Sequence, residues 1–90
     1  MNLEETRKQI DELDQVLVET FEKRLAAVLN IAKIKEAENL KIYDPERETK
    51  VLEKGLAYVN DPSLRDYVKH FLNDVMAVSR SYQKDHIQQH

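Results

Sequence analysis

The stretch from Leu3 to Glu36, LEETRKQIDELDQVLVETFEKRLAAVLNIAKIKE, decides the fold of this chain. It contains neither Gly nor Pro, and it is rich in Leu, Ala, Glu, Lys and Arg, the residues with the highest helix propensity. Its apolar residues recur at helical spacing, from Ile10 through Leu17 to Val28. The stretch therefore predicts one long helix.

This predicted helix is too long for the rest of the chain to cover. Asn2 and Glu5 form a capping-box pattern at its start, and the helix can run to about Glu38. It would then be about 50 Å long, whereas a compact monomer of this size has a radius of gyration of about 12 Å. Its apolar arc spans about half of the circumference. We therefore expect a second copy of the chain to cover the excess in a homodimer.

Two cations interrupt the apolar face of the helix. Arg24 and Lys35 lie within about 20° of each other around the helix axis, near the centre of the apolar arc. A cation at a buried position is costly unless an anion meets it. The helix is therefore expected to bind a negatively charged ligand or partner.

Two Asp-Pro pairs divide the rest of the chain. Asp44-Pro45 predicts the N-cap and first turn of a second helix that ends near Asn60, and Asp61-Pro62 predicts the start of a third. The expected inward residues of these helices are Val51, Leu52, Leu56, Tyr58, Val59, Leu64, Tyr67, Val68, Phe71, Leu72, Val75, Met76 and Tyr82.

The expected architecture is a single all-α domain over residues 1–90, with one long and two shorter helices. The polar end of the chain, residues 84–90, is expected to fray.

Composition narrows the range of functions. The chain has 90 residues, of which 34% are charged, with one Gly and two Pro, and this favours a soluble helical domain. The 14 basic and 17 acidic residues give a net charge of −3, which predicts no nucleic-acid partner and no membrane partner. There is no Cys and no apolar run long enough to cross a bilayer, and the N-terminus does not resemble a secretion signal. We expect a cytoplasmic protein.

Polar residues occupy positions that the helical periodicity marks as buried in each predicted helix. Glu48 lies on the apolar arc of the second helix, and Ser79 and Gln83 lie on that of the third. Together with Arg24 and Lys35 they would line a cavity suited to a small, polar, anionic ligand. A structural ion pair or a snorkelling side chain is the commoner explanation for any one of them, but the whole set favours a binding site.

Arg7 does not fit the same site. On a straight helix it lies about 25 Å along the axis from Arg24 and about 100° around it, so one small ligand cannot contact both. If Arg7 forms a site, in a twofold dimer that site is the pocket of the partner subunit. The alternative is a surface arginine paired with Asp11.

Four segments, in this order and spacing, resemble the all-helical class of chorismate mutase in its free-standing, monofunctional form. They are Arg7 to Asp14, Arg24 with Lys33 to Lys35, Tyr43 to Glu48, and Ser79 to Gln83. The resemblance covers nearly the whole chain. It implies an intertwined homodimer in which the long helices pair and an arginine of each subunit completes the active site of the other.

By the same resemblance, the ligand-binding residues are Arg7 from the partner, Arg24, Lys35, Asp44, Arg47, Glu48, Ser79 and Gln83. The implied reaction is the pericyclic rearrangement of chorismate to prephenate, a step of the shikimate pathway toward phenylalanine and tyrosine, with no covalent intermediate and no cofactor.

The resemblance also implies a role for each residue. Lys35 and Gln83 would donate hydrogen bonds to the breaking ether, and Arg24 and the partner's Arg7 would bind carboxylates. The ring carboxylate would be supported by Ser79 and Arg47, and the ring hydroxyl would be oriented by Glu48 and the region of Asp44.

Other interpretations remain open at this stage. Isochorismate pyruvate lyase has the same fold and a similar cationic pocket, and a non-enzymatic helical dimerisation module could use Arg24 and Lys35 in interface ion pairs. His86 and His90 have the spacing of a metal-binding pair, but no third ligand is evident, so no metal site is expected, and His70 is expected on the surface.

Overall fold

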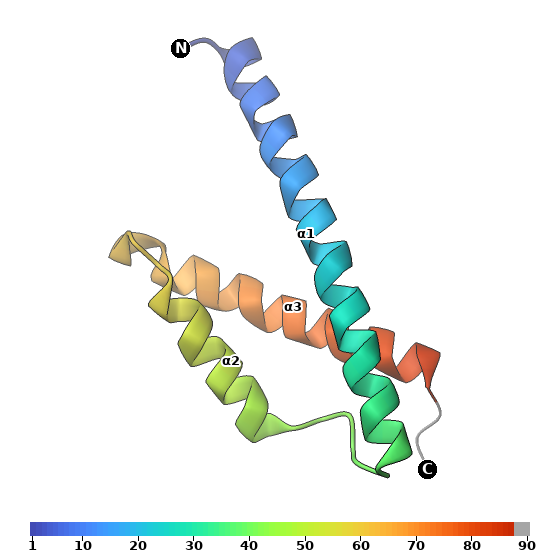
Figure 1. The fold of residues 1–90 in the computed structure, drawn as a ribbon. Helices are drawn as coiled ribbons and strands as arrows, with labels where there is room; N and C mark the ends of the chain where they lie inside the picture. The colour runs from blue at the N-terminus through green and yellow to red at the C-terminus, as the bar shows by residue number, and fades with distance from the viewer. Residues whose placement is uncertain (88–90) are drawn as a thin grey trace.

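The computed structural model describes residues 1–87, and this part of the chain forms helices and no strands. The elements are α1 (Leu3–Ala37), α2 (Pro45–Ala57), a short 3₁₀ helix η1 (Pro62–Leu64) and α3 (Arg65–His86), as shown in Figure 1. The prediction of an all-α fold with one long and two shorter helices is confirmed. None of the helices described combines the length and the apolar character needed to cross a membrane.

The long helix α1 begins and ends at the residues that its sequence indicates. The side chain of Asn2 accepts a hydrogen bond from the N–H of Glu5 at 2.8 Å, as an N-cap does. At the other end, Asn39 adopts a left-handed φ of 57°, and the N–H of Leu40 donates to the carbonyl of Lys35 at 2.7 Å. These contacts turn the chain back toward α2.

Helix α2 begins as expected and ends sooner. The side chain of Asp44 accepts from the N–H of Arg47 at 3.1 Å, and Pro45 occupies the first turn. The predicted end near Asn60 is wrong, because the helix stops at Ala57. There the N–H of Tyr58 bonds to a carbonyl three residues earlier, which tightens the last turn.

The second Asp-Pro pair starts a 3₁₀ turn and not α3 itself, so this expected boundary is also corrected. Asp61 accepts hydrogen bonds from both the hydroxyl of Ser63, at 2.7 Å, and its N–H, at 3.0 Å. These bonds lower the pKa of Asp61. They also hold residues 61–64 in the short turn, and α3 follows from Arg65.

Helix α3 is the central packing element. It crosses the C-terminal half of α1 and contacts α2 on another side, so α1 and α2 diverge around it (Figure 1). Gly55 allows the close approach of α2, because a Cβ atom there would lie 2.5 Å from Cδ1 of Leu72. The small core around α3 consists of Ala32, Ile42, Leu56, Val75 and Met76.

The N-terminal half of α1 projects beyond the other helices (Figure 1), and its apolar side chains are left open to solvent. Ile10, Leu13 and Leu17 are 50%, 61% and 50% exposed. The radius of gyration is 16.2 Å, well above the value of about 12 Å for a compact chain of this length. A single chain therefore leaves this stripe uncovered, and the homodimer expected from the sequence stays a prediction.

Several residues expected to face inward are exposed in the single chain. Tyr58 and Tyr67 are 81% and 76% exposed, and Leu64 and Phe71 are about half exposed. Tyr58 directly follows the last residue of α2, and Leu64 is the last residue of the 3₁₀ turn. Tyr67 and Phe71 lie on a face of α3 that neither α1 nor α2 covers. The expected fraying of residues 84–90 is corrected for residues 84–86, which belong to α3, whereas residues 88–90 lie outside the described part of the chain.

Candidate active site

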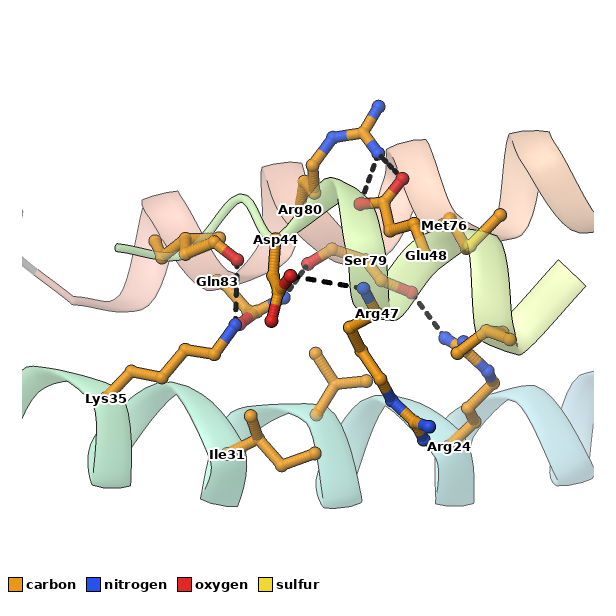
Figure 2. Close-up of a pocket in the computed structure, with 13 residues that line it drawn as sticks. Arg24, Ile31, Lys35, Asp44, Arg47, Glu48, Met76, Ser79, Arg80 and Gln83 are labelled. Carbon is orange, nitrogen blue, oxygen red and sulfur yellow. Dashed lines mark hydrogen bonds and ion pairs between the residues drawn. The ribbon is translucent and has the colours of Figure 1, made fainter. Parts of the chain in front are cut away.

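A pocket of about 130 Å³ opens between the C-terminal half of α1, the start of α2 and the C-terminal half of α3. Figure 2 shows that α1 forms one side, with the α2 and α3 side chains on the other. The lining residues are Arg24, Val28, Ile31, Lys35, Ile42, Asp44, Arg47, Glu48, Val51, Met76, Ser79, Arg80 and Gln83.

Arg24 reaches the pocket from α1 and is held there by a neutral group. Its Nη1 atom donates to the hydroxyl of Ser79 at 2.6 Å, and that hydroxyl donates to the carbonyl of Val75 at 2.7 Å. Ser79 is buried, whereas Arg24 is half-buried. Because a hydroxyl does not neutralise a guanidinium, the positive charge of Arg24 remains available to an anionic ligand.

Lys35 is oriented in a similar way. Its Nζ atom donates to the backbone carbonyl of Ile42 at 2.8 Å, and Ile42 is itself buried. This contact crosses from α1 to the loop that precedes α2. An ammonium has three donors, so the contact fixes the direction of the side chain and leaves further donors for a ligand.

Gln83 contributes a buried amide whose hydrogen bonding is incomplete. It is 8% exposed, and its Nε2 donates to the carbonyl of Ser79 at a long 3.3 Å. Its Oε1 atom is buried and has no hydrogen-bond partner among residues 1–87. Buried polar atoms in proteins normally have partners, so this atom indicates a place where a ligand or water binds.

The start of α2 supplies charged groups of both signs. Asp44 caps the helix through its carboxylate, and Arg47 extends from the first turn toward α1 and lines the same pocket as Arg24 (Figure 2). Both side chains are exposed. Two guanidinium groups that face the same space form a site for a group with more than one negative charge.

Glu48 pairs with Arg80, a residue to which the sequence analysis assigned no role. Nη1 of Arg80 lies 2.5 Å and 2.6 Å from the two carboxylate oxygens of Glu48. The same guanidinium lies over the ring of Tyr43, 5.2 Å from its centroid. The available signal was position, because Arg80 lies one turn from both Met76 and Gln83 on α3.

A family model for chorismate mutase type II matches residues 6–84, which is most of the chain. The chain belongs to the chorismate mutase type II family. Among curated proteins, the T-protein of Haemophilus influenzae is 34% identical over 80 residues, a match that covers 83% of this chain and 21% of the relative. This chain therefore spans about a fifth of the length of that relative.

Membership of the chorismate mutase type II family confirms the resemblance to this family found in the sequence. All the residues expected to bind substrate lie within the matched range. The structure brings seven of them to the same pocket, namely Arg24, Lys35, Asp44, Arg47, Glu48, Ser79 and Gln83. Their individual roles stay predictions.

Arg7 lies outside this pocket. It is exposed on the projecting part of α1, about 25 Å along the helix axis from Arg24. Within residues 1–87 it forms no ion pair with Asp11, the partner that the surface alternative required. Its expected role in the pocket of a partner subunit therefore stays a prediction.

His70 and His86 lie apart from the pocket of this family member. His70 is on the surface, with Nε2 3.2 Å from the carboxylate of Asp74, and Nδ1 of His86 lies 2.9 Å from the carbonyl of Tyr82. His90, the other half of the possible metal-binding pair, lies outside the described residues. Residues 1–87 contain no group of three side chains that could hold a metal ion.

Proposed function

We propose that the chain catalyses the rearrangement of chorismate to prephenate in the cytoplasm, as a homodimer, on the route to phenylalanine and tyrosine. The observation that carries the proposal is the pocket cations: Arg24 and Lys35 are hydrogen-bonded to neutral groups and face the same space as Arg47. Chorismate is a dianion, so its negative charges would neutralise these cations, which their neutral hydrogen-bond partners do not.

The reaction is an isomerisation within one molecule. The ether C–O bond that joins the enolpyruvyl arm to the ring breaks, a C–C bond forms between the arm and the ring, and no atom enters or leaves. Catalysis therefore requires a folded substrate with the arm held over the ring. Arg24 and Arg47, with the partner's Arg7, would hold the two carboxylates in that geometry.

Charge develops on the ether oxygen as its bond to the ring breaks. Lys35 and Gln83 come from opposite sides of the pocket, and each has a further N–H group that can donate a hydrogen bond to that oxygen. Donors fixed before the reaction stabilise the transition state more than the ground state. One such donor accounts for about 10² to 10³ in rate.

The remaining polar residues would recognise the ring. Ser79 is fixed by its bonds to Arg24 and Val75, and its hydroxyl would lie beside the carboxylate that Arg24 or Arg47 binds. Glu48 and Asp44 are hydrogen-bond acceptors on the α2 side and would bind the ring hydroxyl.

The proposal is tested by adding purified protein to chorismate and following the loss of its ultraviolet absorbance, with identification of the product. Formation of prephenate supports the mutase. A second incubation, with isochorismate, distinguishes the lyase: release of pyruvate from isochorismate without turnover of chorismate would replace the proposed function. A folded protein inactive on both compounds would exclude both enzymes.

The amide of Gln83 leads to a prediction about pH. A neutral amide donates at every physiological pH, so the wild-type turnover should change little between about pH 6 and 8. In the Gln83→Glu variant the side chain donates only when protonated, so activity should be low and should rise as the pH falls. Rate profiles of both proteins test this. A steep loss of wild-type turnover on raising the pH through this range would contradict the role given to Gln83.

A further inference from the structure

We propose that Arg80 is a positioning residue, which holds the carboxylate of Glu48 at the pocket wall so that it can orient the ring hydroxyl of the substrate. This inference rests on the proposed mutase function and adds to it a residue that touches Glu48 and not the reacting atoms. Its basis is the pairing of Nη1 of Arg80 with both oxygens of Glu48, at 2.5 Å and 2.6 Å.

The pair joins the segments that enclose one side of the pocket. Glu48 is on α2, Arg80 is on α3, and the guanidinium also covers the ring of Tyr43 in the loop that precedes α2. Figure 2 places the pair across the pocket from Arg24 and Lys35. The Arg80 and Glu48 side chains are 30% and 24% exposed, so water screens the contact less than it would on the surface.

Charge balance explains why the carboxylate needs this partner. Among the lining residues, the cations Arg24, Lys35, Arg47 and Arg80 outnumber the carboxylates Asp44 and Glu48 by two, which matches a dianion.

Without Arg80, the flexible Glu48 carboxylate would face cations on the opposite wall and would repel the substrate carboxylates that those cations bind. The expected effects are weaker substrate binding and loss of the fixed hydrogen-bond acceptor for the ring hydroxyl.

The alternative is a purely structural ion pair, which joins α2 to α3 and has no effect on the substrate. A partly exposed pair of this kind contributes little to stability on average, so stability measurements alone would not separate the two roles. A kinetic double-mutant cycle does separate them, because a residue that acts through Glu48 loses its effect once Glu48 has lost its charge.

The cycle compares the wild type with Arg80→Met, Glu48→Gln and the double variant, all assayed for chorismate turnover and thermal unfolding. We expect Arg80→Met to lower kcat/KM about 10- to 100-fold, the effect of losing a hydrogen bond between charged groups, with a rise in KM as well as a fall in kcat.

In the Glu48→Gln background the same change should have an effect of less than about threefold. Arg80→Lys should restore part of the activity, since an ammonium can also bind the carboxylate. Lys69→Met, at an exposed position of α3 outside the pocket, is the matched control and should behave as the wild type.

Equal losses from Arg80→Met in the presence and absence of the Glu48 charge would overturn the inference, as would an Arg80→Met variant with wild-type kinetic constants. If Arg80→Met does not fold, the Arg80→Lys and Arg80→Gln variants complete the same cycle. An inactive wild type would defeat the proposed function itself, whereas an active wild type with additive losses would defeat this inference alone.

Discussion

Replacing Lys35 with Ala should lower kcat/KM for chorismate about 10³-fold and leave the chain folded, because it removes a preorganised cationic donor from the breaking ether. The loss should fall mainly on kcat, since the interaction is strongest in the transition state. Steady-state kinetics measure the effect, and circular dichroism with size-exclusion chromatography checks the fold and the assembly state.

Lys33→Ala provides a matched control for this variant. Lys33 is an exposed lysine on the same helix, two positions away and outside the pocket, so its loss should leave turnover nearly unchanged. The dimerisation-module alternative makes the opposite prediction for Lys35. If Lys35→Ala dissociates or unfolds the protein while the Lys33 variant does not, Lys35 is an interface residue and the catalytic assignment fails.

A mixture of two inactive variants, Arg7→Ala and Lys35→Ala, should recover activity. The pocket in the Arg7→Ala chain keeps its own Lys35 and receives Arg7 from the other chain, so each heterodimer has one intact site of two. After random exchange of subunits, half of the dimers are heterodimers, and about a quarter of the wild-type activity should return. The exposed position of Arg7, far from its own pocket, is the structural reason to expect this.

The control mixture combines Arg24→Ala with Lys35→Ala. Both residues line the same pocket of one chain, so neither site of a heterodimer is intact and no activity should return. Subunit exchange is verified by mass spectrometry of differently tagged chains. Heterodimers that form and remain inactive in the Arg7 mixture would refute the cross-subunit role.

The sequence was most informative where the local chain determines the structure. The unbroken helix α1, which contains no Gly or Pro, and the side-chain caps at Asn2 and Asp44 are determined by neighbouring residues in the sequence. The structure contains the helix and both caps. The end of α2 and the start of α3 were misplaced. Asp61 with its Pro satisfies a 3₁₀ turn as well as a helix start, and the choice depends on how α2 and α3 pack.

The burial of individual apolar residues was less predictable than their helices. The helical spacing of Tyr67 and Phe71 identifies an apolar face of α3, but it does not show which other element packs against that face. In the single chain both side chains are exposed. The exposed stripe on α1 around Leu13 is a comparable case. There the sequence indicated that the rest of the chain would not cover the stripe, and the single chain leaves it exposed, while the second copy expected to cover it stays a prediction.

The sequence predicted which residues belong to the candidate site better than it predicted the contacts between them. Helical spacing placed Arg24 with Lys35, and Ser79 with Gln83, on common faces, and the structure brings these faces to one pocket. The pairing of Glu48 with Arg80 could not be derived in this way. It depends on the distance between α2 and α3 and on two side-chain conformations, neither of which a periodicity contains.

The contact of Lys35 with the carbonyl of Ile42 bears on how this family member can change in evolution. The backbone carbonyl of residue 42 is present whatever side chain this residue carries, so point mutations in the loop between α1 and α2 do not remove the acceptor. A deletion or an insertion in this loop would move the carbonyl relative to Lys35. We therefore expect selection to act on the length of this loop, on an apolar residue at position 42 and on Asn or Gly at position 39, where the chain is left-handed. Asp44 caps α2 and Tyr43 contacts Arg80, so only positions 38, 40 and 41 of the loop are free to drift.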